Sequence, residues 1–346
     1  MPLSVVVGGQ FGSEGKGKIA QFIARTRSAA AVVRVGGPNS GHSAVNERGK
    51  LITLRQLPAG SISTDAKIIL PAGSLIDVGL LLQEIELLGV SADRLRIDAN
   101  ASIVTEEHRD EERNEALTAT IGSTGSGSGA ALRERLSRVR THLLARDEPR
   151  LQPFLEESTS AAMRNLLNDN ERIVIEGTQG FGLSIWQTRY FPYATSRDTT
   201  AAAFVSEAGL APHDVDEVAM VLRSFPIRVG GNSGPLPNEI DWPTLANEAD
   251  LPSDYHELTS ATLRVRRVAR FDESVVRGAI ISNRPHRIFM NHMDYIDPRW
   301  RNTGPTDRSA HFIEDVERRI GQTIDYIGFE PSQLESTERL RIKRSA

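Results

Sequence analysis

Short apolar runs alternate along the chain with longer stretches in which apolar residues recur at helical spacing. Such alternation of strand and helix patterns is typical of an α/β fold. We therefore expect a large, mostly parallel central sheet that is flanked by helices. The apolar runs that predict strands cover residues 5–7, 30–35, 51–57, 67–70, 95–104, 172–175, 217–225 and 288–290.

Capping residues and amphipathic stripes predict the helices between these strands. Ser74 is expected to cap a helix over residues 75–88, and Gly89 is expected to end it. An apolar stripe predicts a late helix around residues 312–320. Further helices are expected at 16–23, at 106–116 and, with basic character, at 132–140.

Composition narrows the class of protein. The 346 residues are 39% hydrophobic and 25% charged, which is ordinary for a globular chain with a large core. No repeat or clear linker divides them, so we expect a single domain over residues 1–346. The net charge of −4 argues against a nucleic-acid or acidic-membrane partner. The absence of cysteine excludes disulfides, thiolate zinc sites and cysteine nucleophiles.

The predicted location is the cytoplasm. The first residues run directly into a predicted strand, so no signal peptide is expected. No apolar run approaches the ~20 residues that a membrane-spanning helix needs.

A glycine-rich stretch at residues 8–18 follows the first predicted strand. Gly12, Gly15 and Gly17 allow a tight backbone close to a ligand, and Lys16 and Lys18 add positive charge. A strand, a glycine loop and a helix N-terminus together form an anion site. This arrangement predicts a P-loop-like nucleotide-binding fold with insertions.

Two general motifs nearly match this stretch. Residues 12–18 satisfy the P-loop spacing, but Ile19 stands where a P-loop has Ser or Thr for magnesium. Residues 15–20 satisfy a loosened dinucleotide fingerprint, but no acidic residue lies between Glu14 and Glu47. A dehydrogenase is therefore disfavoured, whereas a nucleotide-binding switch without ligase activity stays as an alternative.

Three later segments also combine glycine or charge with polar residues. Residues 36–42 form a second polar glycine loop, and 176–182 follow another predicted strand. The Gly/Ser-rich stretch 121–129 is either a flexible linker or a phosphate-binding loop that leads into the basic helix. The arginines within 259–270 form either a solvated basic face or a carboxylate-binding cluster.

These segments resemble, in order, the motifs of the adenylosuccinate synthetases. The glycine stretch resembles the family signature, with Phe11 in place of Trp and Ser13 in place of Asp. The short chain, with Thr-Gln-Gly-Phe-Gly-Leu-Ser at 178–184, is similar to the compact archaeal-type branch. The other matching segments are 36–43, 121–125, 176–180, 191–196 and 228–230.

The resemblance implies a ligase that couples aspartate to a purine nucleotide after phosphorylating the purine O6. Such chemistry needs a base at N1 and a donor at O6. By resemblance His42 is that donor, Gln179 belongs to the catalytic group, and Lys16 neutralises phosphoryl charge. Magnesium is expected at Ser13 and Gly41. The expected nucleotide-binding residues are Gly12, Gly15, Lys16, Gly17, Lys18, Asn39, Gly41, Thr124, Arg138, Gln179, Thr195 and Asp294, with Arg138 delivered across a homodimer interface.

The amino and phosphoryl donors follow from two later segments. The family's aspartate-binding motif resembles residues 261–266, in which Thr262, Arg264 and Arg266 survive. An arginine fork suits the two carboxylates of aspartate. Residues 291–294 keep the Asp of a guanine-reading motif and lose its Lys. ATP or dATP is therefore favoured as donor, and GTP stays as an alternative.

Ser13 decides between two substrates. The family's Asp at this position is the N1 base, whereas a serine hydroxyl is neutral at pH 7. The replacement implies either an inactive enzyme or a different substrate. A phage branch of the family shows the same replacement and acts on dGMP, whose 2-amino group would crowd a carboxylate. We therefore expect dGMP, aspartate and a nucleoside triphosphate as substrates, with an ordinary IMP-dependent synthetase as the alternative.

Overall fold

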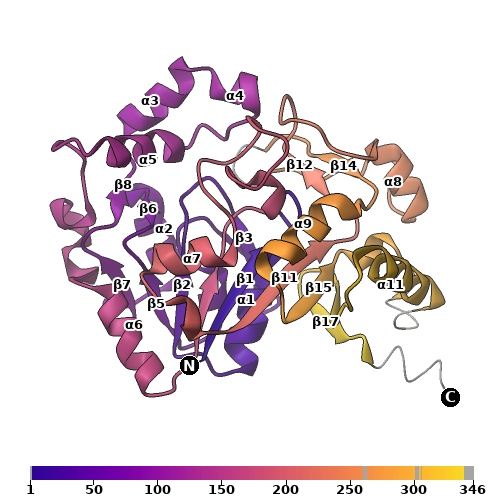
Figure 1. The fold of residues 1–346 in the computed structure, drawn as a ribbon, viewed down its shortest axis with the longest axis horizontal. Helices are drawn as coiled ribbons and strands as arrows, with labels where there is room; N and C mark the ends of the chain where they lie inside the picture. The colour runs from indigo at the N-terminus through magenta and orange to yellow at the C-terminus, as the bar shows by residue number, and fades with distance from the viewer. Residues whose placement is uncertain (1, 260–262, 301–303, 305, 339–346) are drawn as a thin grey trace.

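A ten-stranded sheet forms the centre of the computed structural model, which describes residues 2–259, 263–300, 304 and 306–338 (Figure 1). The strand order is β17-β16-β15-β11-β1-β10-β2-β5-β7-β9. The strands are β1 (Leu3–Gly8), β2 (Ala31–Arg34), β5 (Lys67–Leu70), β7 (Leu95–Asp98), β9 (Leu155–Glu156), β10 (Ile173–Glu176), β11 (Val215–Arg223), β15 (Arg287–Asn291), β16 (Tyr326–Phe329) and β17 (Gln333–Ser336).

Every neighbouring pair in this sheet is parallel except β16 with β17. The mostly parallel α/β sheet predicted from the sequence is confirmed. Because parallel strands end at the same edge, the loops that follow β1, β2, β10 and β11 meet there. The order also places β1, which precedes the glycine stretch, at the centre of the sheet.

Helices cover both faces of the sheet. One core cluster joins Val5 and Val7 of β1 to α6 (Thr159–Asn168), α7 (Ala201–Ala208), α9 (Glu273–Asn283) and α11 (Asp307–Ile320). The other joins Val6 to α1 (Lys16–Thr26) and α2 (Val78–Leu88). Successive side chains of a strand point to opposite faces, so the valine run of β1 contributes to both cores.

Smaller elements surround the carboxyl edge of the sheet. In Figure 1, α3 (Glu106–Asn114), α4 (Leu117–Ile121) and α5 (Ser128–Ser137) lie together at one end of the molecule. Three small sheets pair β3 (His42–Val45) with β4 (Leu51–Leu54), β6 (Leu75–Ile76) with β8 (Ser102–Ile103), and β14 (Arg267–Ala269) with both β12 (Ile227–Arg228) and β13 (Glu239–Ile240). Helix α8 (Trp242–Glu248) follows β13.

The start of α2 differs from the prediction. Residues 75–76 form β6, and Asp77 rather than Ser74 caps the helix by accepting the N–H of Leu80 at 3.1 Å. The Ser74 hydroxyl instead donates to the carbonyl of Arg34 at 3.0 Å. Gly89 ends the helix in the left-handed region with φ 61°, as predicted.

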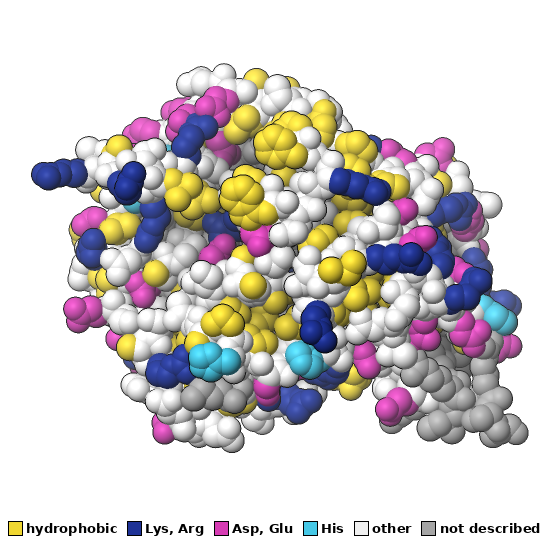
Figure 2. All heavy atoms as spheres, viewed as in Figure 1, with side chains coloured by type: hydrophobic (Ala, Val, Ile, Leu, Met, Phe, Trp, Pro, Cys, Tyr) yellow, Lys and Arg dark blue, Asp and Glu magenta, His cyan; other side chains and the backbone are white. Residues whose placement is uncertain are grey.

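Two further predicted elements have different bounds. The predicted strand at 95–104 is divided into β7 and β8 by a turn. The predicted basic helix begins earlier, at Ser128, and ends at Ser137. In the described part of the chain, no helix combines the length and the apolarity that crossing a membrane requires. Acidic and basic side chains are interspersed on the face shown in Figure 2.

Replacing Gly79 within α2 and Gly89 at its C-cap should change the stability of the protein in opposite directions. Gly89→Ala places a Cβ at positive φ with nothing near it, so it should destabilise the fold by about 1 kcal/mol through backbone strain alone. Gly79→Ala, inside the same helix, should stabilise by about 0.5 kcal/mol because it restricts the unfolded chain. Thermal unfolding of both variants checks the pair. A stabilising Gly89→Ala would contradict the left-handed cap.

Candidate active site

A cavity of about 420 Å³ opens at the carboxyl edge of the sheet. The loops after β1, β2 and β10 contribute to its lining, as do the segment around β12 and the loop between α4 and α5. Ligands of parallel α/β sheets bind in this position. Of the residues predicted to act on substrate or metal, the cavity brings together Gly12, Ser13, Lys16, Asn39, Gly41, His42, Thr124, Gln179, Thr195 and Arg266.

The other predicted residues lie elsewhere. Gly15 and Gly17 belong to the start of α1, and Lys18 is buried in its first turn. Asp294 lies in η6 (Met293–Tyr295), after β15. Arg264 lines a neighbouring hollow together with residues of α3 and α4. Arg138 is exposed at the end of α5, and Thr262 lies outside the described residues.

A buried carboxylate organises the glycine stretch. Glu14 is fully buried, and its Oε1 accepts the N–H groups of Gly12 at 2.8 Å and Gln10 at 3.2 Å. Its Oε2 pairs with Lys16 Nζ at 2.7 Å. A Cβ on Gly180 would lie only 2.4 Å from this carboxylate, so the glycines of two different loops pack around it. Glu14 therefore stabilises the loop by binding its backbone N–H groups, and its ion pair with Lys16 keeps this lysine at the cavity.

The N-terminus of α1 is suited to binding an anion. Gly15 is the N-cap residue in a left-handed conformation with φ 90°, and no side chain caps the first turn. The free N–H groups and the helix dipole favour negative charge there. The glycine loop thus has the features that a triphosphate requires.

A second buried carboxylate holds His42. Glu176 ends β10, is fully buried, and lies beside Arg34 in the register of the adjacent strand. Its Oε1 contacts His42 Nδ1 at 2.6 Å and Arg34 Nη1 at 2.9 Å. The N–H groups of Ala59 and Gly60 donate to the same carboxylate at 3.1 and 2.9 Å. Arg34 Nη1 also contacts His42 Nδ1. Because an ionised carboxylate can only accept, we assign the Nδ1 proton to the bond with Glu176, and Nε2 is then the ring nitrogen left for a substrate.

The surrounding charges set the ionisation of this pair. Burial, followed by the Arg34 charge, lowers the pKa of His42 to about 3, against the opposing hydrogen bond and charge of Glu176. Burial alone would raise the pKa of Glu176, but the hydrogen bond from His42 and the Arg34 charge lower it to about 2. A neutral imidazole therefore faces an ionised carboxylate at neutral pH.

One cavity wall is built from the Arg-Val-Gly segment. The guanidinium of Arg228 lies 4.8 Å from the ring centroid of Phe11, which is the family's Trp position. Arg228 also donates to the carbonyls of Tyr193 at 2.8 Å and Pro235 at 3.1 Å. Cation–π stacking and these hydrogen bonds fix the wall behind the glycine loop. Arg228 is thus held in place where it lines the cavity.

The Gly/Ser-rich stretch is anchored to α3. Glu112 accepts the N–H groups of Gly127 at 2.9 Å and Gly129 at 2.8 Å, where α5 begins. The stretch therefore packs against α3 instead of forming a free linker, and it places Thr124 at the cavity.

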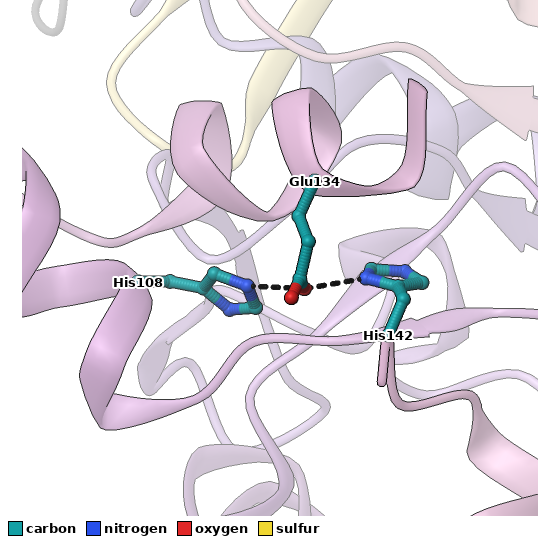
Figure 3. A group of neighbouring side chains, drawn as sticks. All are labelled: His108, Glu134 and His142. Atoms are coloured by element: carbon teal, nitrogen blue, oxygen red, sulfur yellow. Dashed lines mark hydrogen bonds and ion pairs between the residues drawn. The ribbon is translucent and has the colours of Figure 1, made fainter. Parts of the chain in front are cut away.

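The other end of α5 is joined to α3 by Glu134 (Figure 3). Its Oε2 accepts from His108 Nε2 at 2.8 Å and from His142 Nδ1 at 2.7 Å. This trio has the composition of a metal site. However, His108 Nδ1 already accepts the N–H of Thr105 at 3.0 Å, so Nε2 carries the proton that it donates. We therefore interpret the trio as a hydrogen-bonded bridge that holds the segment carrying Arg138.

The predicted donor segment meets the first turn of α1. Lys18 Nζ donates to the carbonyl of Glu330 at 2.8 Å. The N–H of Glu330 donates to Asp294 Oδ1 at 3.4 Å, and Asn291 Nδ2 donates to the carbonyl of Glu14 at 2.8 Å. The glycine stretch and the segment after β15 are thus directly connected, although they lie at opposite ends of the sequence.

Comparison with known proteins identifies the relatives of this arrangement. The family model described as adenylosuccinate synthetase matches residues 5–148 and 141–299. The adenylosuccinate synthetase of Methanococcus aeolicus is 37% identical over 349 residues, which cover 99% of this chain and 100% of the relative. The chain belongs to the adenylosuccinate synthetase family. The enzyme of Pyrococcus horikoshii is 36% identical, with 94% of this chain and 95% of the relative covered.

Two solved structures share the fold. The cyanophage S-2L succinoaminodeoxyadenylate synthetase (PurZ), bound to dGMP and dATP as an energy donor, is 29% identical with a TM-score of 0.80, covering 97% of this chain and 95% of that chain. The fully ligated adenylosuccinate synthetase of Plasmodium falciparum is 20% identical with a TM-score of 0.83, covering 97% and 100%. At that identity the second likeness concerns the fold alone.

Membership makes the chain a C–N bond-forming ligase of purine nucleotide biosynthesis. The family uses Mg²⁺ and a nucleoside triphosphate. The residues of this chain fit both groups, because the uncapped N-terminus of α1 suits phosphates, and the Ser13 hydroxyl and Gly41 carbonyl offer the oxygen ligands that Mg²⁺ prefers. The predicted family and enzyme class are confirmed.

Sequence reasoning missed the residues that hold the site together. Glu14 lies in the glycine-rich stretch and Glu176 in the segment 176–182, but the sequence alone did not assign either residue a function. For Arg34 and Glu176 a signal was present, since each is an ionisable residue that ends an apolar strand run. Glu112 lies in the helix predicted over residues 106–116, and only the fold shows that it faces the start of α5.

Lys18 supplies a test of this environment. Burial lowers its pKa from 10.5 to about 7, although the Asp294 carboxylate opposes the shift. Between these two pKa values the unfolded chain binds more protons than the folded chain, so this lysine's destabilising effect diminishes as the pH rises. Lys18→Met should therefore increase the free energy of unfolding, and this increase should become smaller between about pH 6 and about pH 9.

The exposed Lys67 provides the control for that measurement. Chemical denaturation of wild type, Lys18→Met and Lys67→Met across the pH range decides the result. Parallel profiles for wild type and Lys18→Met would show that Lys18 keeps its charge, and the buried description of the first turn would be wrong.

Proposed function

We propose that this enzyme couples L-aspartate to O6-activated dGMP with hydrolysis of a nucleoside triphosphate. The product is N6-succino-2-amino-2′-deoxyadenylate, an intermediate for 2-aminoadenine nucleotides. One observation carries the choice of acceptor. Among the described residues that line the cavity, Glu112 alone bears a carboxylate, and it is engaged by the start of α5. Ser13 therefore leaves the glycine loop without an acidic base toward the substrate.

Guanine chemistry fits a serine at this position. The 2-amino group of guanine lies beside N1, where the family's carboxylate would crowd it. A serine is smaller, and its hydroxyl offers an acceptor lone pair to an N–H group. The structural likeness to the cyanophage enzyme, which was solved with dGMP, supports the same acceptor. The proposed acceptor is thus a guanine nucleotide in its deoxy form.

The reaction uses the residues of the cavity in two steps. O6 attacks the γ-phosphorus of the donor, the nucleoside diphosphate leaves, and the N1 proton is released to water. The aspartate amine then attacks C6, and inorganic phosphate leaves with the new C–N bond formed. His42, held by Glu176, contacts O6 and the transferring phosphoryl group, while Lys16 offsets its charge.

Ligand contacts follow from the same arrangement. Asn39, Thr124, Gln179 and Thr195 line the cavity and are assigned to the phosphate, ribose and base of the acceptor. Mg²⁺ would be held at Ser13 and Gly41, where it would offset phosphate charge. Arg266, with Thr262 and with Arg264 from the neighbouring hollow, is assigned to aspartate.

The donor is assigned to the segment after β15. Asp294 keeps an acceptor there, but the family's Lys is absent at His292. ATP or dATP is the proposed donor, and the cyanophage neighbour was solved with dATP.

The main rival is an ordinary IMP-dependent synthetase. The archaeal relatives named above favour it, since both are adenylosuccinate synthetases. In the IMP-dependent enzymes a carboxylate at this position is the N1 base, and IMP has no 2-amino group that the carboxylate would crowd. This chain has Ser13 there instead. The switch alternative is excluded by membership in a ligase family.

Acceptor selectivity tests the proposal. With ATP and aspartate, phosphate release should show a higher kcat/KM for dGMP than for GMP or IMP. Ser13→Asp restores the carboxylate and should lower dGMP activity, because the carboxylate would crowd the 2-amino group of guanine. The same variant should gain activity with IMP. If wild-type enzyme turns over IMP with the higher kcat/KM, the ordinary synthetase is the correct assignment.

Arg138 tests the proposed homodimer. It does not line the cavity of its own chain, and its neighbours Leu136 and Val139 are 71% and 43% exposed. Arg138→Leu and His42→Ala should each be inactive, whereas the mixture should regain up to about a quarter of wild-type activity. Random mixing makes half of the dimers hybrid, and each hybrid has one intact site.

The exposed Arg140 is the matched control for that experiment. Arg140→Leu should retain activity by itself, because only the charge at 138 is assigned to the substrate phosphate. If subunits exchange by a tagged pull-down and no activity returns, Arg138 does not act across a dimer.

A further inference from the structure

Arg223 ends β11 and is the largest fully buried side chain among the described residues. A buried guanidinium requires a counter-charge and hydrogen-bond acceptors. Its Nη2 pairs with Glu257 Oε1, and its Nη1 lies 3.3 Å from Glu257 Oε2. The same Nη1 donates to the carbonyl of Ser13 at 3.2 Å. Arg223 thus connects the glycine loop to Glu257.

Glu257 also accepts hydrogen bonds from two more segments. Arg266 Nη1 donates to its Oε2 at 2.7 Å, and the Tyr295 hydroxyl donates to its Oε1 at 2.7 Å. Arg266 belongs to the segment assigned to aspartate, and Tyr295 directly follows residues 291–294, which are assigned to the donor nucleotide. The Glu257 side chain is 12% exposed, so these partners replace nearly all of its water.

The ionisation of Glu257 agrees with these contacts. Burial would raise its pKa, but the charge and hydrogen bond of Arg223, together with the charge of Arg266, hold the pKa well below its usual range. The carboxylate is therefore charged throughout the neutral range. One fixed negative charge joins the glycine loop, the aspartate segment and the donor segment.

We propose that Glu257 is a positioning residue that couples donor binding to aspartate binding. It holds the Arg266 guanidinium through Nη1, while the Arg266 side chain lines the cavity. Occupation of the donor segment fixes Tyr295, and Tyr295 fixes Glu257 and hence Arg266. By thermodynamic reciprocity, aspartate then tightens the donor by the same factor. The inference rests on the proposed assignment of these two segments to donor and aspartate.

A pair of single-hydroxyl deletions tests the coupling. Tyr255 OH bonds with Tyr295 OH at 2.7 Å, so Tyr255→Phe removes a hydroxyl from the same aromatic pair without touching Glu257. Tyr295→Phe removes the contact to Glu257 itself. Calorimetry would measure the Kd of a non-hydrolysable ATP analogue with and without aspartate, in the presence of acceptor.

Wild type and Tyr255→Phe should show the same several-fold tightening by aspartate, and Tyr295→Phe should lose most of it. Equal tightening in all three proteins would overturn the proposal. The acceptor is whichever of dGMP and IMP the enzyme turns over, so a failed dGMP assignment leaves this test intact.

Glu257→Gln provides the second measurement. It should raise the KM for aspartate about tenfold or more, because a charge-assisted anchor of Arg266 is lost, while the KM for the acceptor changes less than about twofold. Glu239→Gln, which loses an exposed pair with Arg267 on the neighbouring strand, is the control and should leave both values unchanged. Equal increases for aspartate and acceptor would make Glu257 merely structural. If Glu257→Gln does not fold, the tyrosine pair still decides the question.

Discussion

The burial of the Glu176 carboxylate is the constraint on which the site depends. A carboxylate without water must find donors, and here they come from Arg34, His42 and the N–H groups of residues 59 and 60. These donors belong to β2, β3 and η1 (Ala59–Ser61), so one charge joins three elements around the end of β10. Removing the carboxylate would leave Arg34 buried without its counter-charge, which typically costs several kcal/mol.

Three other carboxylates around the cavity are likewise occupied by donors from the protein itself. Glu14 lies beneath the glycine loop, Glu112 holds the start of α5, and Glu257 joins Arg223 to Arg266. Each of these carboxylates connects a loop to the framework instead of facing substrate. The loops can therefore present backbone amides, hydroxyls and a neutral imidazole to a strongly anionic set of ligands, while the acidic groups serve as internal anchors. This division explains why so many negative charges surround a phosphate-binding site.

Much of the fold was predictable from the sequence because local patterns specify it. The valine run of β1, the glycine stretch and the left-handed stop at Gly89 each depend on neighbouring residues alone. Ser74 failed as a cap because Asp77 competes for the same role three residues later, and the Ser74 hydroxyl serves a different strand. The cavity was predictable through its motifs, which place Ser13, Asn39, His42 and Gln179 together.

Partners that meet only through the fold were not predictable. Glu257 touches Arg223 and Tyr295 because β11 and β15 are adjacent in the sheet, and strand order cannot be read from periodicity. Arg264 shows the same limit, since its motif groups it with Arg266, whereas the fold places Arg266 at the main cavity and Arg264 in the hollow beside α3 and α4.

The central claim is that a His42 imidazole held by Glu176 promotes phosphoryl transfer to the acceptor before aspartate reacts. Positional isotope exchange in ATP that carries ¹⁸O in the β–γ bridge tests this directly. With dGMP and Mg²⁺ but no aspartate, wild-type enzyme should scramble the label, and His42→Ala should bind dGMP yet scramble it at least about 10²-fold more slowly. Scrambling at the wild-type rate in His42→Ala, or scrambling that needs aspartate, would contradict the account.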